Sequence, residues 1–165
     1  MKTKSLLLAI AMLSSSSAFA AAAPTKQTTA SISVSVEVKA ECTVDSNPLD
    51  MGSGSLLLAG AAGTASIAVA CTNTVPYQIG LDAGDAAGST IQNRVLVGLN
   101  PANSVSYNIY TDAQHQTVWG MTPGVDTVAG VGTGITAFTN ANVYLAKQNV
   151  APDTYSSNVT VFLTF

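Results

Sequence analysis

A histidine and its polar neighbours are the first residues in this chain that could carry catalysis. His115 is the only histidine among 165 residues. A Ser-His-Asp triad needs that base to be oriented by other side chains. His115 instead lies in the polar stretch 112–116, DAQHQ, which has the composition of a hairpin turn. We expect a solvated loop histidine and no catalytic residues, and we predict that the protein is not an enzyme.

Two aspartates and a glycine-rich stretch could bind ions. Asp82 and Asp85 flank a glycine in the segment LDAGD, but the further oxygen ligands of a calcium loop are missing. Aspartate beside glycine is typical of turns, because its short side chain bonds to nearby backbone N–H groups. The glycine-rich segment 130–134 lacks the Lys-Ser/Thr pair and the following helix of a phosphate-binding loop. We expect turns at both places, no metal site and no cofactor.

Three aromatic residues could form a platform that stacks on a sugar: Tyr107, Tyr110 and Trp119. Tyr107 alternates with Val105 and Ile109, which favours a place in the core. Tyr110 and Trp119 remain candidates for contact with a ligand.

The first twenty residues have the order of a secretory signal. Lys2 and Lys4 precede a short apolar run at 6–13, and the AFA tripeptide at 18–20 fits the small-x-small cleavage rule. We predict a signal peptide over 1–20. The apolar run is too short to span a bilayer, and no later segment is long enough to do so. The mature protein is expected to be exported.

Cys42 and Cys71 are the only cysteines. In an exported chain the oxidising compartment makes a disulfide between them the expected state. Closing this loop should contribute about 3.5 kcal/mol to stability. A metal or nucleophilic role would need partner side chains, and His115 is far away in the sequence.

Charge is scarce in the mature chain. Removing residues 1–20 leaves 165 − 20 = 145 residues, and losing Lys2 and Lys4 gives a formal charge of 4 − 9 = −5. That length fits one ordinary domain. Without a cluster of lysine or arginine there is no electrostatic footprint for nucleic acid. The thin charge fits either a surface partly covered by neighbours, since isolated soluble domains usually carry more, or a secreted β protein, in which low charge is also common.

Short strands are predicted throughout the chain. Val, Ile, Thr and Tyr dominate the patterned segments, and Gly, Pro, Asn and Asp interrupt them at short intervals, which favours an all-β sandwich. We expect loops at 52–63 and 124–134. We expect strands within 41–51, 65–71, 77–81, 91–99, 105–109, 118–119, 135–138, 143–145 and 158–165.

The segment 28–39 alternates between apolar and polar residues, which is the pattern of a strand with one buried face. It precedes Cys42 and follows a polar leader, so it could be a detachable arm rather than the first strand of a closed domain. We predict an arm over 21–39 and a domain over 40–165. The apolar side of the arm consists of Ala30, Ile32, Val34, Val36 and Val38.

The last residues alternate in the same way, and no later segment is left to pair the second edge of this terminal strand. Its apolar side consists of Val159, Val161, Leu163 and Phe165. If the arm of another subunit supplies the missing strand, the unfilled acceptor would expose an apolar groove and an open edge. Such a subunit would need a chaperone that fills the groove temporarily.

Three stretches resemble the spore coat protein U domain family. The first is Cys71-Thr72 with Pro76-Tyr77 and the segment IGLDAG at 79–84. The second is YNIYTD at 107–112, followed by VWG at 118–120, and the third is the ending 155–165. The likeness runs from about residue 28 to residue 165. This family includes shaft subunits of archaic, Csu-type chaperone–usher pili.

The resemblance implies an incomplete immunoglobulin-like β-sandwich that is completed by a donor strand from a neighbouring identical subunit. A periplasmic chaperone would lend a strand, and an outer-membrane usher would catalyse its exchange for the arm of the next subunit. The protein would pass through the periplasm into an extracellular pilus that supports adhesion and biofilm formation. Carried onto this sequence, the donor face is Ala30, Ile32, Val34, Val36 and Val38, the acceptor edge is Val159, Val161, Leu163 and Phe165, and Cys42–Cys71 joins the first two strands.

Two other functions fit parts of the sequence. A secreted carbohydrate-binding sandwich would use Trp119 and Tyr110 and fold as a monomer without help. A coat or matrix protein would use the same domain but assemble without chaperone and usher. The polar leader at 21–29 is longer than a minimal arm needs, so the exact donor register stays open.

Overall fold

The computed structural model describes residues 25–57 and 59–165. The predicted signal peptide over 1–20 lies outside these residues, as do residues 21–24 of the predicted arm. The chain divides into two units, 1–36 and 37–165. In the first unit, residues 25–36 are exposed and form no strand.

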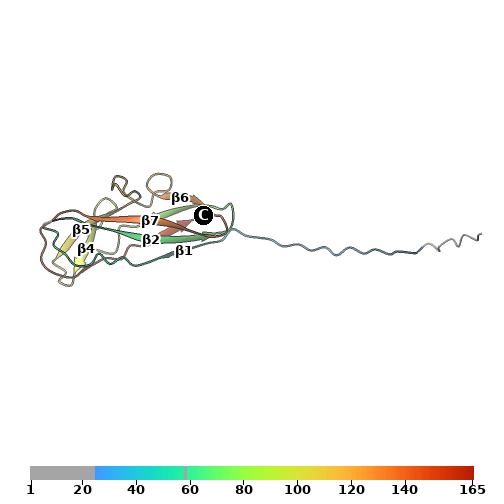
Figure 1. The fold of residues 1–165 in the computed structure, drawn as a ribbon, viewed down its shortest axis with the longest axis horizontal. Coiled ribbons are helices and arrows are strands. Elements are labelled where there is room, and N and C mark those ends of the chain that lie inside the picture. The colour runs from blue at the N-terminus through green and yellow to red at the C-terminus, as the bar shows by residue number, and fades with distance from the viewer. Residues whose placement is uncertain (1–24, 58) are drawn as a thin grey trace, which may run out of the picture. The chain divides into compact units, whose positions relative to one another are not determined.

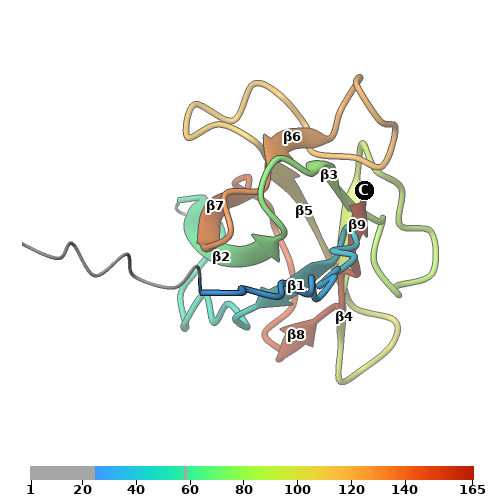
Figure 2. The same ribbon diagram turned by 90° about the vertical axis from the view of Figure 1, so that its right-hand side faces the viewer.

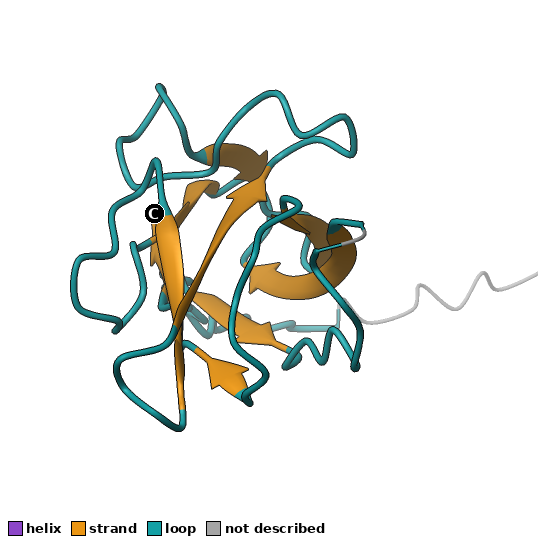
Figure 3. Cartoon of the chain, turned by 90° about the vertical axis from the view of Figure 1, so that its left-hand side faces the viewer, coloured by secondary structure: helices purple, strands orange, loops and turns teal. Residues whose placement is uncertain are grey.

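The second unit is all-β: its described residues contain strands and loops but no helix (Figure 3). A larger antiparallel sheet and a smaller one form an immunoglobulin-like sandwich (Figure 1). The order in the larger sheet is β1 (Cys42–Ser46), β2 (Ala61–Cys71), β7 (Thr136–Leu145), β5 (Ser104–Tyr110), β4 (Arg94–Gly98) and β8 (Tyr155–Ser156). The order in the smaller sheet is β6 (Val128–Val131), β3 (Pro76–Leu81) and β9 (Val161–Thr164).

Alternating residues of three strands form much of the core, as the sequence pattern predicts, and β7 adds Ala141, Val143 and Leu145. Ile67, Val69 and Cys71 are buried on β2, because each second side chain of a strand points to the same face. The other two strands supply Tyr77, Ile79 and Leu81 from β3, and Val105, Tyr107 and Ile109 from β5. The placement of Tyr107 in the core is confirmed.

Several strand boundaries differ from the prediction. β2 begins at Ala61, so the predicted loop 52–63 is wrong at its end, β4 begins at Arg94 and β9 covers only Val161–Thr164. β1 ends at Ser46 instead of residue 51, two residues before Pro48, which cannot donate to a ladder. β7 is one continuous strand, because β2 pairs with it from Ala61 to Ala70. Residues 118–119 form only a bridge, between Val118 and Tyr110.

β6 lies inside the predicted loop 124–134. Its Gly130 pairs with Tyr77 of β3, and a Cβ at Gly130 would collide with the Tyr77 ring. Glycine in a strand often marks such a close approach. The glycine therefore permits this strand instead of preventing it.

Candidate functional site

One edge of β1 and one edge of β9 face each other without a strand between them. β1 pairs only with β2, and β9 pairs only with β3, among residues 25–57 and 59–165. The two strands belong to different sheets but lie close together (Figure 2). The sandwich is therefore open along this side.

A cavity of about 430 Å³ lies at this opening. The end of β1 and the segment after it, 46–51, form one wall, and residues 157–161 form the other. The floor is made of core side chains: Ala65, Ile67, Leu81, Leu96, Tyr107, Ile109, Val143 and Leu145. We call this cavity and the two strand edges beside it the groove. It lies between two strand edges, over side chains of the buried core.

The residues that line the two walls show the relative direction of β1 and β9. The carboxyl end of β1, at Ser46, lies across the cavity from Val159 and Val161, at the start of β9. β1 and β9 are therefore antiparallel. A strand that entered the groove antiparallel to β9 would run parallel to β1.

The predicted acceptor residues divide into two groups. Val159, Val161 and Leu163 are half-buried and pack against the core. In the ladder, Val161 is opposite Leu81 and Leu163 is opposite Ile79. Phe165 follows β9 and is 57% exposed. The alternation predicted for the terminal strand therefore holds for the first three residues.

Asp82 fixes the chain where β9 begins. Its Oδ1 accepts the Thr160 N–H at 2.8 Å, and its own N–H donates to the Thr160 carbonyl at 3.1 Å. The same Oδ1 accepts the Gly84 N–H at 2.9 Å, and Gly84 has φ of +85°. The predicted turn at 82–85 is confirmed. The sequence pattern did not show that the turn holds the segment before β9.

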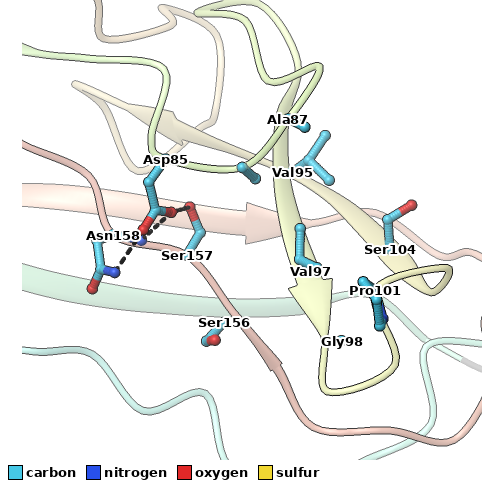
Figure 4. A pocket seen from close by; sticks show the side chains of 11 residues that line it. Asp85, Ala87, Val95, Val97, Gly98, Pro101, Ser104, Ser156, Ser157 and Asn158 are labelled. Atoms are coloured by element: carbon cyan, nitrogen blue, oxygen red, sulfur yellow. Dashed lines mark hydrogen bonds between the residues drawn. The ribbon is translucent and has the colours of Figure 1, made fainter.

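Asp85 holds the preceding residues of the same segment (Figure 4). Its carboxylate accepts the Asn158 N–H at 2.9 Å, the Asn158 Nδ2–H at 2.7 Å and the Ser157 Oγ–H at 3.3 Å. The Asn158 backbone N–H is the main cause that lowers the pKa of Asp85. Ser157 and Asn158 also line the groove, so Asp85 positions part of its wall.

We call the hydrogen bonds from Ser157 and Asn158 to the Asp85 carboxylate the Asp85 latch. A second hollow, of about 630 Å³, lies beside this latch (Figure 4). It is lined by the loop at 85–87, by Val95 and Val97 of β4, and by residues 156–158. Its polar atoms come from serines, an asparagine and the Asp85 carboxylate, whose oxygens are already bonded to Ser157 and Asn158. We assign no ligand to it.

The predicted disulfide between Cys42 and Cys71 is present, with an S–S distance of 2.01 Å. The two cysteines are register partners at the start of β1 and the end of β2. The bond therefore ties the β1 wall of the groove to the larger sheet.

Arg94 is a buried charged residue that the sequence analysis missed. Its guanidinium donates to the carbonyls of Asp82 at 2.8 Å, Leu81 at 3.1 Å and Trp119 at 2.8 Å. It also donates to Asn108 Oδ1 at 2.7 Å and more weakly to the Ile91 carbonyl at 3.4 Å. Burial lowers the pKa of Arg94. The side chain connects β4, β5 and the end of β3, and one of its partners, Leu81, also lines the groove.

The aromatic residues proposed as a sugar platform are not exposed together. Trp119 is fully buried, and its indole N–H donates to the Ile79 carbonyl at 2.9 Å. Trp119 therefore presents no ring face to solvent. Tyr110 packs against His115, with ring centroids 5.2 Å apart.

His115 is half-buried instead of a solvated loop residue. It stacks on Tyr144, with ring centroids 4.7 Å apart and an interplanar angle of 20°. Its φ of +58° places it in the left-handed region, inside a hairpin that Asp112 closes by accepting the N–H groups of Gln114, Gln116 and Thr117. The predicted turn is correct, but the ring packs on the sheet.

The predicted donor residues are exposed. Ile32 and Val34 are each 90% exposed, Val36 is 87% and Val38 is 76%. Ala30 is exposed as well. Aliphatic and polar side chains alternate along this segment, and all of them are exposed. The exposure of the aliphatic side chains to water is unfavourable as long as the segment pairs with no other strand.

Over 25–57 and 59–165, no helix is long and apolar enough to cross a membrane. Within the same ranges, no group of three or more His, Cys, Asp or Glu side chains is arranged to hold a metal ion.

Comparison with known proteins identifies the family. The family model of the Spore Coat Protein U domain matches residues 28–162. The chain belongs to the Spore Coat Protein U domain family. A search of curated proteins finds no match for this member.

Two solved structures are similar to this Spore Coat Protein U domain. One is a CsuC–CsuE chaperone–tip adhesion subunit pre-assembly complex from archaic chaperone–usher Csu pili of Acinetobacter baumannii. The matched chain has 16% identity and a TM-score of 0.59, over 78% of this chain and 40% of that chain. The other is a chaperone–tip adhesin complex of CFA/I fimbriae biogenesis, with 14% identity and a TM-score of 0.43, over 72% and 38%. The first likeness supports the immunoglobulin-like fold, and this chain spans less than half of either matched chain.

Proposed function

We propose that this protein is a pilus shaft subunit that polymerises by donor-strand exchange. The observation that carries the proposal is the groove between β1 and β9, in a chain that also has an exposed alternating arm. The groove lies between two strand edges without a strand between them, and the arm is an exposed alternating segment that pairs with no sheet among the described residues. The arm of a second copy of the chain would fill the groove and would itself be paired there.

The chemistry of the two surfaces is complementary. The groove floor is aliphatic and aromatic, and its two strand edges offer unpaired backbone N–H and C=O groups. The arm offers Ala30, Ile32, Val34, Val36 and Val38 on one face and polar residues on the other. Burying about four aliphatic side chains contributes roughly 6–12 kcal/mol before the cost of ordering the arm. Backbone pairing adds register and specificity.

An empty groove is an aggregation hazard, so the subunit requires a temporary partner. A periplasmic chaperone that lends a strand fits this requirement, and an outer-membrane usher would exchange that strand for the arm of the next subunit. The Csu complex is a chaperone bound to a pilus subunit. The product is an extracellular fibre that supports adhesion and biofilm formation, and the chain reaches it through the signal peptide at 1–20.

The two alternative functions have less support. A sugar-binding sandwich would need an exposed aromatic platform, whereas Trp119 is buried. A coat or matrix protein would present the same groove and arm, and it differs only in assembling without chaperone and usher.

Substitution on the arm tests the proposal. Val34→Asp places a charge on the face that should enter the groove, so the subunit should still bind the chaperone but stop donating. The matched control is Ser33→Asp, which places the same charge on the polar face. Each variant is expressed with its chaperone and usher, fibre length is measured by electron microscopy, and chaperone binding is measured by co-purification. Fibres of normal length from the Val34→Asp chain would reject the donor assignment.

A further inference from the structure

The root of the arm, residues 38–41, is held against the sandwich where β1 begins. The Thr72 N–H donates to the Glu41 carbonyl at 2.9 Å, which extends the β1–β2 pairing past the disulfide by one residue. The Thr72 hydroxyl accepts the Glu41 N–H at 3.2 Å, and it can donate its one proton either to the Glu41 carbonyl at 3.2 Å or to the Lys39 carbonyl at 3.4 Å. One half-buried hydroxyl therefore contacts the root on both sides of Ala40.

The strand directions restrict how an arm can enter the groove of its own chain. The arm leads directly into β1, so it reaches the free edge of β1 only by reversing direction at the root. It would then run antiparallel to β1 and, since β1 and β9 are antiparallel, parallel to β9. An arm from a second copy has no such connection and can enter antiparallel to β9.

The root also lacks the residues that such a reversal needs. Two-residue hairpin turns favour Asn-Gly, Asp-Gly or Gly-Gly, because their central residues take positive φ. The root is Val38-Lys39-Ala40-Glu41, with no Gly, Asn or Asp. Its residues are exposed and form no turn in this structure.

We propose that the root of the arm, clamped by Thr72 and devoid of turn residues, prevents the arm from entering its own groove and so directs it to a second copy. This inference rests on the proposed function, because it presumes that the groove accepts the arm. It assigns to Thr72 and residues 38–41 a role in selecting intermolecular over intramolecular pairing.

Refolding of the mature chain at low concentration tests the inference. The full chain is unfolded with its disulfide intact and then diluted, and monomers are separated from multimers by size exclusion with light scattering. Hydrogen exchange of residues 28–38 in the monomer fraction reports whether the arm is inserted. The test compares four variants with the wild type: Lys39→Asn with Ala40→Gly, Lys39→Ser with Ala40→Ser, Thr72→Val and Thr72→Ser.

The Asn-Gly variant should yield monomers with a protected arm, whereas wild-type monomers and the Ser-Ser control should keep an arm that exchanges freely. Thr72→Val should raise the share of monomers with a protected arm about fivefold, because the loss of one net hydrogen bond changes an equilibrium constant by about that factor. Thr72→Ser retains the hydroxyl and should match the wild type. Protected arms in wild-type monomers, or equal shares in the Asn-Gly and Ser-Ser chains, would overturn the inference. An unchanged share in Thr72→Val would overturn the role of Thr72.

A peptide experiment separates this inference from the proposed function. A synthetic peptide of residues 28–39 is added to the full Val34→Asp chain, whose own arm should not donate. If the peptide raises the unfolding midpoint and the root variants still have no effect, only the inference about the root fails. If the chain does not take up the peptide, the groove does not accept the arm and the proposed function fails.

Discussion

Asp85 binds both the backbone and the side chain of Asn158, seventy-three residues later in the chain. The carboxylate accepts the Asn158 N–H at 2.9 Å and the Nδ2–H at 2.7 Å. Asn158 lines the groove, and Asp82 holds Thr160 immediately before β9. The two aspartates of one turn thus position the segment that leads into the proposed acceptor edge.

The Asp85 latch predicts a loss of stability in acid. The pKa of Asp85 is lower in the folded chain than its ordinary value of 3.8, because Asn158 donates hydrogen bonds to the charged form. The latch therefore stabilises the fold above the unfolded pKa, and this contribution disappears as the pH falls through the folded pKa. Urea unfolding should show wild type more stable than Asp85→Asn at pH 7, with the gap closing below about pH 4.

The matched control for this experiment is Asp45→Asn. Asp45 is exposed on β1, and its carboxylate accepts only the N–H of the adjacent Ser46 among the described residues. This variant removes one negative charge without changing the contact between Asp85 and Asn158, so it controls for the loss of charge alone. A constant gap between wild type and Asp85→Asn from pH 7 to pH 2 would show that the latch does not act through the carboxylate charge.

Arg94 should be essential to the fold. Arg94→Met keeps most of the volume but leaves the carbonyls of Leu81, Asp82 and Trp119 without their donor. Each buried group left unsatisfied costs about 1–3 kcal/mol, so the free energy of unfolding should fall by at least about 3 kcal/mol. Denaturant titration measures this, and the exposed Lys147→Met is the control that should change little. A loss below about 1 kcal/mol would contradict the role given to Arg94.

The disulfide should stabilise the chain and hold the wall of the groove. Replacing both Cys42 and Cys71 by serine should lower the free energy of unfolding by about 3.5 kcal/mol. The β1 strand should also exchange its amide hydrogens faster, because β1 pairs with one strand only in the described part of the chain. Denaturant titration and hydrogen exchange measure the two effects. Equal protection of β1 in both chains would mean that the ladder with β2 alone holds the wall.

The strands that alternate most regularly were predictable because alternation reflects burial of one face. Residues 65–71, 77–81 and 105–109 fall in β2, β3 and β5, and their apolar residues are buried. The pairing of the two cysteines followed from their number and from the predicted export of the chain. The alternation of the last residues likewise predicted which side chains of β9 face the core.

Other features depend on residues that are distant in sequence. No local sequence pattern predicts that Arg94 is buried, because its partners lie in β3, β5 and the segment at 119. β6 depends on the ring of Tyr77 lying over Gly130, which no window of sequence contains. The burial of Trp119 likewise depends on the Ile79 carbonyl, forty residues earlier. Each of these features depends on contacts between residues that only the folded sheets bring together, so no local sequence pattern predicts it.

A charge on the inner face of β9 should damage the proposed acceptor. Val161 packs toward the core opposite Leu81, so Val161→Asp would bury an unpaired carboxylate beside the groove floor. We expect degradation in the periplasm and no chaperone-bound subunit. The control is Thr164→Asp, on the exposed face of the same strand, which should leave chaperone binding intact. Periplasmic abundance and co-purification with the chaperone measure both variants. A stable, chaperone-bound Val161→Asp subunit would place the acceptor elsewhere on the domain.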